Sequence, residues 1–314
     1  MSRSRRIVII SDTHMGRPNA PVASPDQLRP LWRDASRLIV NGDLAEINDV
    51  RYRANAARQV CRLQDLCDSD GVDLTLISGN HDPLLTDQRF VTLMDGQLYA
   101  THGDVLHPSI SPWSTHAEEL AHFNRRALAM LRSPARASEI GRLAASQYAS
   151  FASWDDRHAA PEDNESAEAT EPPAAPSAAE KGRRLVDLAR RAAVTLWCWH
   201  TLPRRAAQFM LEYAPESRFF IFGHIHRAGI WTLKERVIIN TGCYGFPSRP
   251  RAVVIEDDQV SVVPVQQSSD GSWCMANRPL QSWSIAPART EIAVGHDLMP
   301  DRREDPPETE SLAA

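Results

Sequence analysis

The stretch Ser78-Gly79-Asn80-His81-Asp82 (SGNHD) follows directly on the apolar run VDLTLI at residues 72–77. Gly, Asn and Asp accept unusual backbone angles, and Pro83 comes next, so a plain turn is one interpretation. The other is a functional site, because an amide, an imidazole and a carboxylate at the end of a buried strand are all chemically useful. The functional interpretation requires partners elsewhere in the chain.

Other short apolar runs end in similar polar groups. The run RRIVII leads into Asp12 and His14, RLIV into Asp43, GQLYA into His102, and RFFIF into His224 and His226. Runs of this length and composition are typical of buried strands. Residues 48–71, between the second and third runs, have apolar side chains at helical spacing and Gly71 as a stop. Strand–helix–strand alternation predicts an α/β fold, in which ligands bind beyond the carboxyl ends of the strands.

Composition excludes several classes of protein. The chain has 314 residues, 42% of them hydrophobic, and a net charge of -5, which gives no general affinity for nucleic acid. No apolar run approaches the roughly 18 residues that span a bilayer, and the apolar run after the basic start is too short for a signal peptide. The five cysteines are scattered, without a CxxC pair, as expected for reduced thiols in the cytoplasm.

The composition and the predicted secondary structure of the chain change along its length. We expect a core at residues 1–110 and 216–298, with strands at 229–245 and 251–265 forming a second sheet on the first. Residues 111–215 read as a helical cap insertion, with an acidic, alanine-rich flexible loop at about 160–182. Residues 299–314 read as a disordered acidic tail.

The polar strand ends supply a set of candidate metal ligands that share oxygen or imidazole donors and include no thiolate: Asp12, His14, Asp43, Asn80, His102, His224 and His226. This donor set suits manganese, with iron or zinc as alternatives. Residues two apart on an extended segment point the same way, so each D-x-H or H-x-H pair presents two donors together. Seven donors exceed the needs of one ion. Two ions sharing a carboxylate would use them all; a single-ion hydrolase is the alternative.

The order D-x-H, G-D, G-N-H-D, H, G-H-x-H resembles the calcineurin-like metallophosphoesterase superfamily from about residue 6 to residue 265. The resemblance implies a two-sheet αββα sandwich with the cap as an insertion. It implies that the first ion is bound by Asp12, His14 and His226, and the second by Asn80, His102 and His224. Asp43 would bridge the two ions.

The resemblance also gives His81 and Asp82 catalytic roles. His81 would lie beside the scissile phosphate as a general acid or charge stabiliser, and Asp82 would orient its imidazole. Gly79 would let the backbone turn between the strand and these residues. The implied reaction is hydrolysis of a phosphodiester or pyrophosphate bond by a metal-bridging hydroxide. A scaffold without catalysis and a phosphomonoesterase are the alternatives.

The sequence narrows the class of substrate only in part. The Asp-Arg-Gly sequence of the protein phosphatases is absent after Asp43, and the insertion lies between the fourth and fifth blocks, as in the UDP-2,3-diacylglucosamine hydrolase branch. The chain departs from that branch at His81, where the branch has Arg, and at His107, where it has Cys. We therefore expect a phosphorylated small-molecule, nucleotide- or lipid-linked substrate, no nucleic acid, and a cytoplasmic protein with peripheral contact at the inner membrane face as an alternative.

Three further features have competing interpretations. The cap contains arginine pairs, which are either solvated helix faces or phosphate-binding groups. Trp197 and Trp199, with Leu196, Phe209 and Met210, form an apolar cluster that is either cap core or a slot for an acyl chain. Residues 240–245, after the run RVIIN, are either a turn or part of the pocket.

Overall fold

The computed structural model describes residues 6–107, 109–113, 117–118, 121–122, 178–285 and 293–294. Its strands are β1 (Ile7–Ile10), β2 (Arg37–Asn41), β3 (Asp73–Ile77), β4 (Phe90–Leu93), β5 (Leu98–Thr101), β6 (Phe219–Phe222), β7 (Gly229–Leu233), β8 (Arg236–Asn240), β9 (Arg251–Glu256), β10 (Gln259–Gln267), β11 (Trp273–Met275), β12 (Gln281–Ser284) and β13 (Ala293–Val294). Its helices are α1 (Arg53–Asp70) and α4 (Ala178–Tyr213), with 3-10 turns η1 (Pro25–Leu31) and η2 (Asp104–Leu106). All five strands expected before a polar cluster form, and α1 ends at Gly71 in the left-handed conformation, as predicted.

The strands form two mixed sheets. One has the order β11-β10-β9-β1-β2-β3, with β12 beside β10, and β1, β2 and β3 run parallel. The other has the order β13-β4-β5-β6-β8-β7, and β5, β6 and β8 run parallel. Each sheet therefore contains neighbouring parallel strands whose carboxyl ends lie at a common edge.

The division of strands between the sheets differs from the prediction. The strands after residue 226 do not form a sheet of their own: β8 pairs with β6, whereas β9 pairs antiparallel with β1. The strands β5 and β6, expected beside β1–β3, belong to the second sheet. Sequence alternation identifies the hairpins β7–β8 and β9–β10, but it does not show which sheet edge each hairpin joins.

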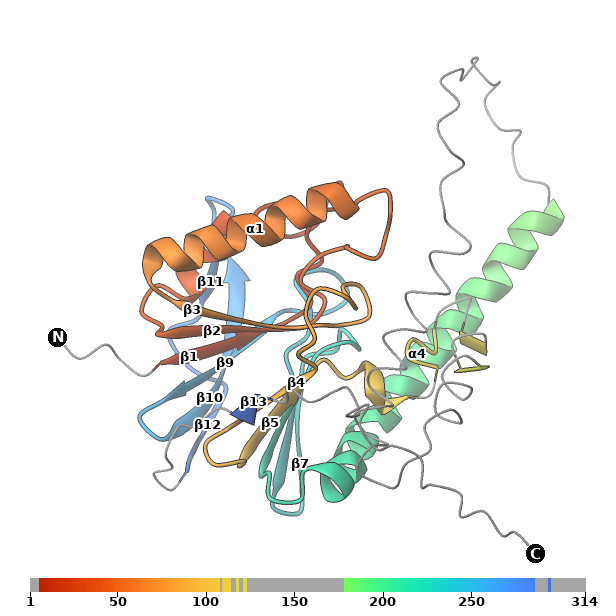
Figure 1. Cartoon of the computed structure of the whole chain (residues 1–314). Helices are drawn as coiled ribbons and strands as arrows, with labels where there is room; N and C mark the ends of the chain where they lie inside the picture. Colours follow the sequence, from red (N-terminus) through yellow and green to blue (C-terminus); the bar gives the residue numbers. More distant parts are fainter. Residues whose placement is uncertain are drawn as a thin grey trace, which may run out of the picture.

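Successive side chains of the strands point to opposite faces of each sheet, and both faces are apolar, which gives a four-layer α/β sandwich. Ile7 and Ile9 of β1 pack in the core between the sheets with Phe219 and Ile221 of β6. The opposite face of β1 packs under α1 and η1. The opposite face of β6 packs against α4, so that the two helices cover the outer faces of the two sheets (Figure 1). The predicted αββα architecture is confirmed.

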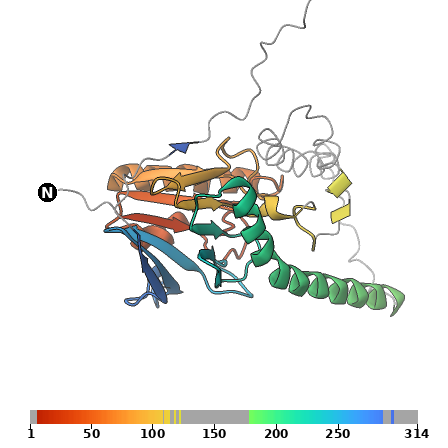
Figure 2. The same cartoon turned by 90° about the horizontal axis from the view of Figure 1, so that it is seen from below.

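The second half of α4 belongs to this sandwich and not to a cap. Leu202, Phe209 and Met210 pack on the β6 face among Phe220 and other buried residues. The sequence placed the whole of 111–215 in the cap because α4 precedes β6 without a break in helical pattern. The first half of α4 does project beyond the sheets, as both views show (Figures 1 and 2).

Some expectations fall on residues that the structure does not describe. These are residues 123–177 of the cap, which include most of the expected flexible loop, and residues 299–314 of the tail. Residues 178–182, expected in that loop, are helical and begin α4. Among the described helices, none has both the length and the apolar character needed to cross a bilayer.

The packing of α4 makes a prediction about stability. Met210 is fully buried against the second sheet, whereas its neighbour Leu211 is 64% exposed. Met210→Ala should lower the free energy of unfolding by about 2–5 kcal/mol, because it removes buried contacts and leaves a cavity. Leu211→Ala should change it by about 0.5 kcal/mol or less. Urea unfolding measures both; equal, small effects would show that α4 is not a layer of the fold.

Candidate metal centre

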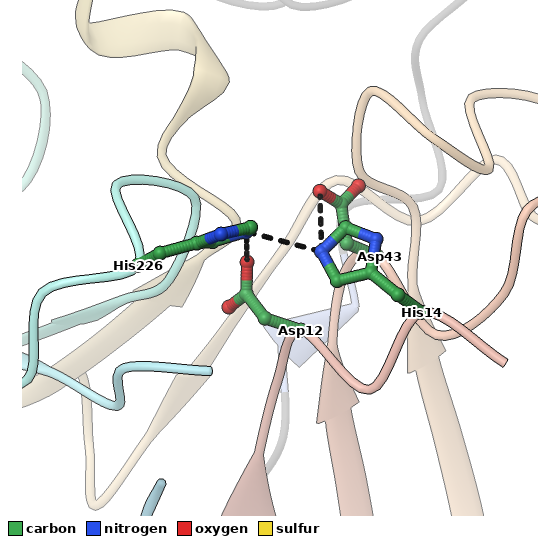
Figure 3. Close-up of side chains that lie close together, drawn as sticks. All are labelled: Asp12, His14, Asp43 and His226. Carbon is green, nitrogen blue, oxygen red and sulfur yellow. Dashed lines mark hydrogen bonds and ion pairs between the residues drawn. The ribbon is translucent and has the colours of Figure 1, made fainter. Parts of the chain in front are cut away.

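The seven candidate ligands come from the carboxyl ends of parallel strands in both sheets. The first sheet contributes Asp12 and His14 after β1, Asp43 after β2 and Asn80 after β3; the second contributes His102 after β5, and His224 and His226 after β6. Segments more than 200 residues apart in sequence thus meet at one edge of the sandwich, and Figure 3 shows four of these side chains converging.

Their donor atoms form two groups that share Asp43. In the first group, one ligand atom from each of Asp12, His14, Asp43 and His226 lies within 4.8 Å of every other. His14 Nε2 is 3.0 Å from His226 Nε2, and His226 Nε2 is 3.4 Å from Asp12 Oδ1 (Figure 3). Two imidazole nitrogens and two carboxylates facing one point are suited to a divalent cation.

The second group comprises Asp43, His102 and His224, whose ligand atoms also lie within 4.8 Å of one another. Asn80 joins it, since its Oδ1 is 3.2 Å from His102 Nε2. The shared atom is Asp43 Oδ2, which lies 3.2 Å from His102 Nε2 and 3.8 Å from His14 Nε2. The division of donors into two sets around one carboxylate is the arrangement that two ions require.

Hydrogen bonds behind the imidazoles set their tautomers. His14 Nδ1 donates to Glu46 Oε1 over 2.9 Å, and His102 Nδ1 donates to the carbonyl of Asn41 over 3.1 Å. His224 uses its other nitrogen, Nε2, to donate to the carbonyl of Ile110 over 2.8 Å. Because each partner can only accept, the second nitrogen of each ring is the one left to bind a metal.

The backbone that carries the ligands is left-handed where extended structure was expected. Asp12, His14, Asp43, His224 and His226 have φ between 50° and 67°. Non-glycine residues adopt this region rarely and at a cost of about 1–3 kcal/mol each. His224 and His226, which both have this conformation, belong to different ligand groups. Strain of this kind concentrates at functional sites.

Glycine is required in two of the motifs by close approach. A Cβ on Gly79 would overlap the carboxylate of Asp43 and lie 2.6 Å from its backbone nitrogen. A Cβ on Gly223 would overlap the carboxylate of Asp12. Gly79 is not among the glycines with positive φ, so close approach, and not a left-handed backbone, is what requires glycine at this position.

Asp82 has a different role from the one expected. Its buried carboxylate accepts hydrogen bonds from the backbone amides of Gly79 (2.6 Å), Leu44 (2.7 Å) and Asp43 (3.2 Å). It therefore ties the loop after β3 to the loop after β2, which sets the position of Asn80 relative to Asp43. It does not orient the imidazole of His81, because backbone amides occupy both of its oxygens.

Glu46 is the residue that orients His81, and the sequence analysis missed it. His81 Nδ1 donates to Glu46 Oε2 over 2.8 Å, and Arg17 Nη2 donates to the same oxygen over 2.9 Å. Since its other oxygen accepts from His14, one buried carboxylate holds both a candidate metal ligand and the candidate acid. The only signal in the sequence is an acidic residue three positions after Asp43.

The electrostatics of the centre are those of acids and imidazoles in close contact. Although burial opposes ionisation, His102 and His81 hold the pKa of Asp43 well below its usual value. Burial lowers the pKa of His102, but Asp43 outweighs it and raises that pKa to about 10. Burial also lowers the pKa of His81, and Asp43 and Glu46 reverse this and raise it to about 9. Burial lowers the pKa of His224 to about 3, with His102 adding to the effect.

A cavity of about 190 Å³ opens beside the centre. It is lined by the centre residues Asp43, Asn80, His81, His224 and His226, and by Trp113, Thr195, Trp199, Ile225 and Pro247. The metal centre and the imidazole of His81 thus face one space.

The position of each cap residue relative to the cavity distinguishes between the two interpretations of these residues. Phe209 and Met210 are core, as described above, whereas Trp199 lines the cavity and Trp197 lies outside it, 47% exposed. Among the described residues, no arginine lines the cavity. Asn240 supports a turn, since it donates to the carbonyl of Gly223 and accepts from the amide of Gly242.

No family model matches the sequence, and no curated protein matches it. Solved structures with a similar layout include a dimetal phosphatase from Danio rerio, 13% identical, with a TM-score of 0.41 over 84% of this chain and 96% of the phosphatase. A single mutant of Vps29 from Entamoeba histolytica is 12% identical, with a TM-score of 0.38 over 88% of this chain and 99% of Vps29. A predicted phosphoesterase from Streptococcus pneumoniae TIGR4 is 11% identical, with a TM-score of 0.36 over 90% and 98%. At this level of identity a shared layout does not transfer an activity.

The raised pKa of His102 predicts that metal binding releases protons. At pH 7 an imidazole with a pKa of about 10 carries a proton that a metal must displace, so affinity should rise as the pH rises. Titration calorimetry with Mn²⁺ in buffers of different ionisation enthalpy should therefore give a heat that depends on the buffer. A heat independent of the buffer would contradict the protonated state of the centre.

Proposed function

We propose that this chain is a dinuclear metal-dependent phosphoesterase of the calcineurin-like type, which hydrolyses a phosphodiester or pyrophosphate bond. The observation that carries the proposal is the position of Asp43 in both ligand groups, with its Oδ2 facing the imidazoles of each. The ligand sets are Asp12, His14 and His226 on one side and Asn80, His102 and His224 on the other. When bound, two such ions supply Lewis-acid stabilisation of a phosphoryl group and a water-derived nucleophile at neutral pH. Manganese suits the donors best, with iron or zinc as alternatives.

In this proposal His81 acts as the general acid. Its Nδ1 is committed to Glu46, and its ring lines the cavity with Nε2 4.0 Å from Asp43 Oδ2. Protonated Nε2 can give its proton to the leaving oxygen, while the Nδ1–H bond to Glu46 keeps the ring in place. Glu46 thus acts through His81 as a positioning residue.

The cavity favours a diester over a monoester. A monoester dianion is usually met by cationic side chains such as arginine forks. Apart from the residues of the centre itself, the cavity walls in the described part of the chain are Trp113, Thr195, Trp199, Ile225 and Pro247, none of which is charged. An uncharged substituent on the phosphorus suits such walls. A nucleotide- or lipid-linked substrate, handled in the cytoplasm or at the inner face of the membrane, remains our expectation for the physiological reaction.

The test compares esters that differ in their need for acid assistance. The Mn²⁺-loaded protein should cleave bis-p-nitrophenyl phosphate faster than p-nitrophenyl phosphate, and chelation should abolish both activities. His81→Ala should lower kcat by about 10²–10⁴-fold on a diester with an alkyl leaving group, the range that general acids contribute. Its effect on the p-nitrophenyl diester should be much smaller, because p-nitrophenolate leaves without a proton.

The control is His200→Ala, which removes an exposed imidazole of α4 and should leave both rates unchanged. Equal losses on both leaving groups in His81→Ala would contradict the role of His81 as acid. Full metal loading without turnover of any ester would favour the scaffold interpretation, and faster turnover of the monoester would favour a phosphomonoesterase.

A further inference from the structure

We infer that the cavity beside the metal centre is a subsite for one aromatic ring attached to the phosphoryl group, formed chiefly by Trp113 and Trp199. This inference rests on the proposed function for the phosphoryl end of the ligand only. It concerns the substituent, which the metal ligands do not define, and it makes the preferred substrate an aryl or heterocycle-bearing phosphoester in place of an acyl-chain lipid.

The walls of the cavity are neutral and mostly apolar. Beyond the centre residues, it is lined by two indoles, an isoleucine, a proline and a single hydroxyl, that of Thr195. Phe246, which directly precedes the wall residue Pro247, leaves 97% of its side chain exposed.

The two indoles are fixed to the segment that carries the metal ligands. Trp199 Nε1 donates over 2.8 Å to the carbonyl of Ile225, the residue between His224 and His226. The ring of Trp113 lies 5.0 Å from the ring of His224. Both indoles therefore contact the segment that carries His224 and His226, and they line the same cavity as these two imidazoles.

Trp199 is also held from its other side. The guanidinium of Arg227 lies 5.7 Å from the ring of Trp199, and its Nη1 donates over 2.7 Å to the Trp199 carbonyl. A rigid indole costs little conformational entropy when it binds a ligand, and aromatic rings pack on such faces in offset or edge-on contacts. A flexible alkyl chain gains less from a planar wall of this kind.

The volume of the cavity is of the size that one ring occupies. A protein cavity of about 150 Å³ holds one benzene molecule, and drug-sized ligands need roughly 300–1,000 Å³. The cavity here is about 190 Å³, and the phosphoryl group must share it. Most of a long acyl chain would extend beyond this space and away from its walls.

The test measures binding and needs no turnover. Dissociation constants of methylphosphonate, phenylphosphonate and n-octylphosphonate would be measured by titration calorimetry on the Mn²⁺-loaded full chain. Phenylphosphonate should bind about ten-fold more tightly than methylphosphonate, the usual effect of filling an apolar pocket. n-Octylphosphonate should show no advantage over phenylphosphonate.

Matched variants locate the effect. Trp199→Leu should abolish the preference for phenyl over methyl, whereas Trp197→Leu, two positions along α4 and outside the cavity, should keep it. Thr195→Trp should remove phenylphosphonate binding by filling the space, and it serves if Trp199→Leu does not fold, as judged by circular dichroism. Retention of the preference in both Trp199→Leu and Thr195→Trp would overturn the inference.

The remaining outcomes separate the two proposals. Equal affinity for methyl- and phenylphosphonate, or tighter binding of the octyl compound, would overturn the ring subsite and leave the phosphoesterase intact. Phenyl preference without hydrolysis of any ester would support the subsite and argue against the catalytic proposal. Absence of binding by all three phosphonates would overturn both.

Discussion

One carboxylate oxygen, Oδ2 of Asp43, determines how the rest of the site is arranged. Asp43 is almost fully buried, and its other oxygen accepts the backbone N–H of His81 over 2.9 Å. Oδ2 is thereby directed at imidazoles from both sheets. An ionised carboxylate at this depth requires positive charge close by, because burial without compensation costs far more free energy than a domain can spare. Protonated imidazoles supply that charge in the metal-free chain, and two cations would supply it in the loaded protein.

The surrounding structure is consistent with that demand. Left-handed residues at Asp12, His14 and His226 bring their side chains in from two sheets, and Gly79 and Gly223 leave room for the two carboxylates. Packing in the sandwich core offsets this backbone strain, because the ligand loops follow short, fully buried strands such as Ile7–Ile10 and Phe219–Phe222. The proposed function depends on the edge where the two sheets meet.

Much of this was predictable from the sequence, because strand ends and donor types are local properties. The five strands, the stop of α1 at Gly71 and the convergence of the seven donors follow from apolar runs and the residues after them. What the sequence did not show depends on tertiary contacts. Glu46 differs from any solvated glutamate only through the imidazoles it meets. The same holds for the pairing of β9 with β1 and the docking of α4 on β6. Several apolar surfaces could accept each element, and the local sequence pattern does not show which one does.

The most direct test of the central claim is a count of bound metal in the wild-type chain and in Asp43→Asn, after loading with Mn²⁺ and removal of the excess. The control is Asp49→Asn, which changes a buried carboxylate that is paired with Arg51 outside the ligand groups. Two ions in the wild type and in Asp49→Asn, with both ions lost or greatly weakened in Asp43→Asn, is the result expected of a shared carboxylate. Two ions retained in Asp43→Asn, or no bound metal in the wild type, would contradict the dinuclear centre.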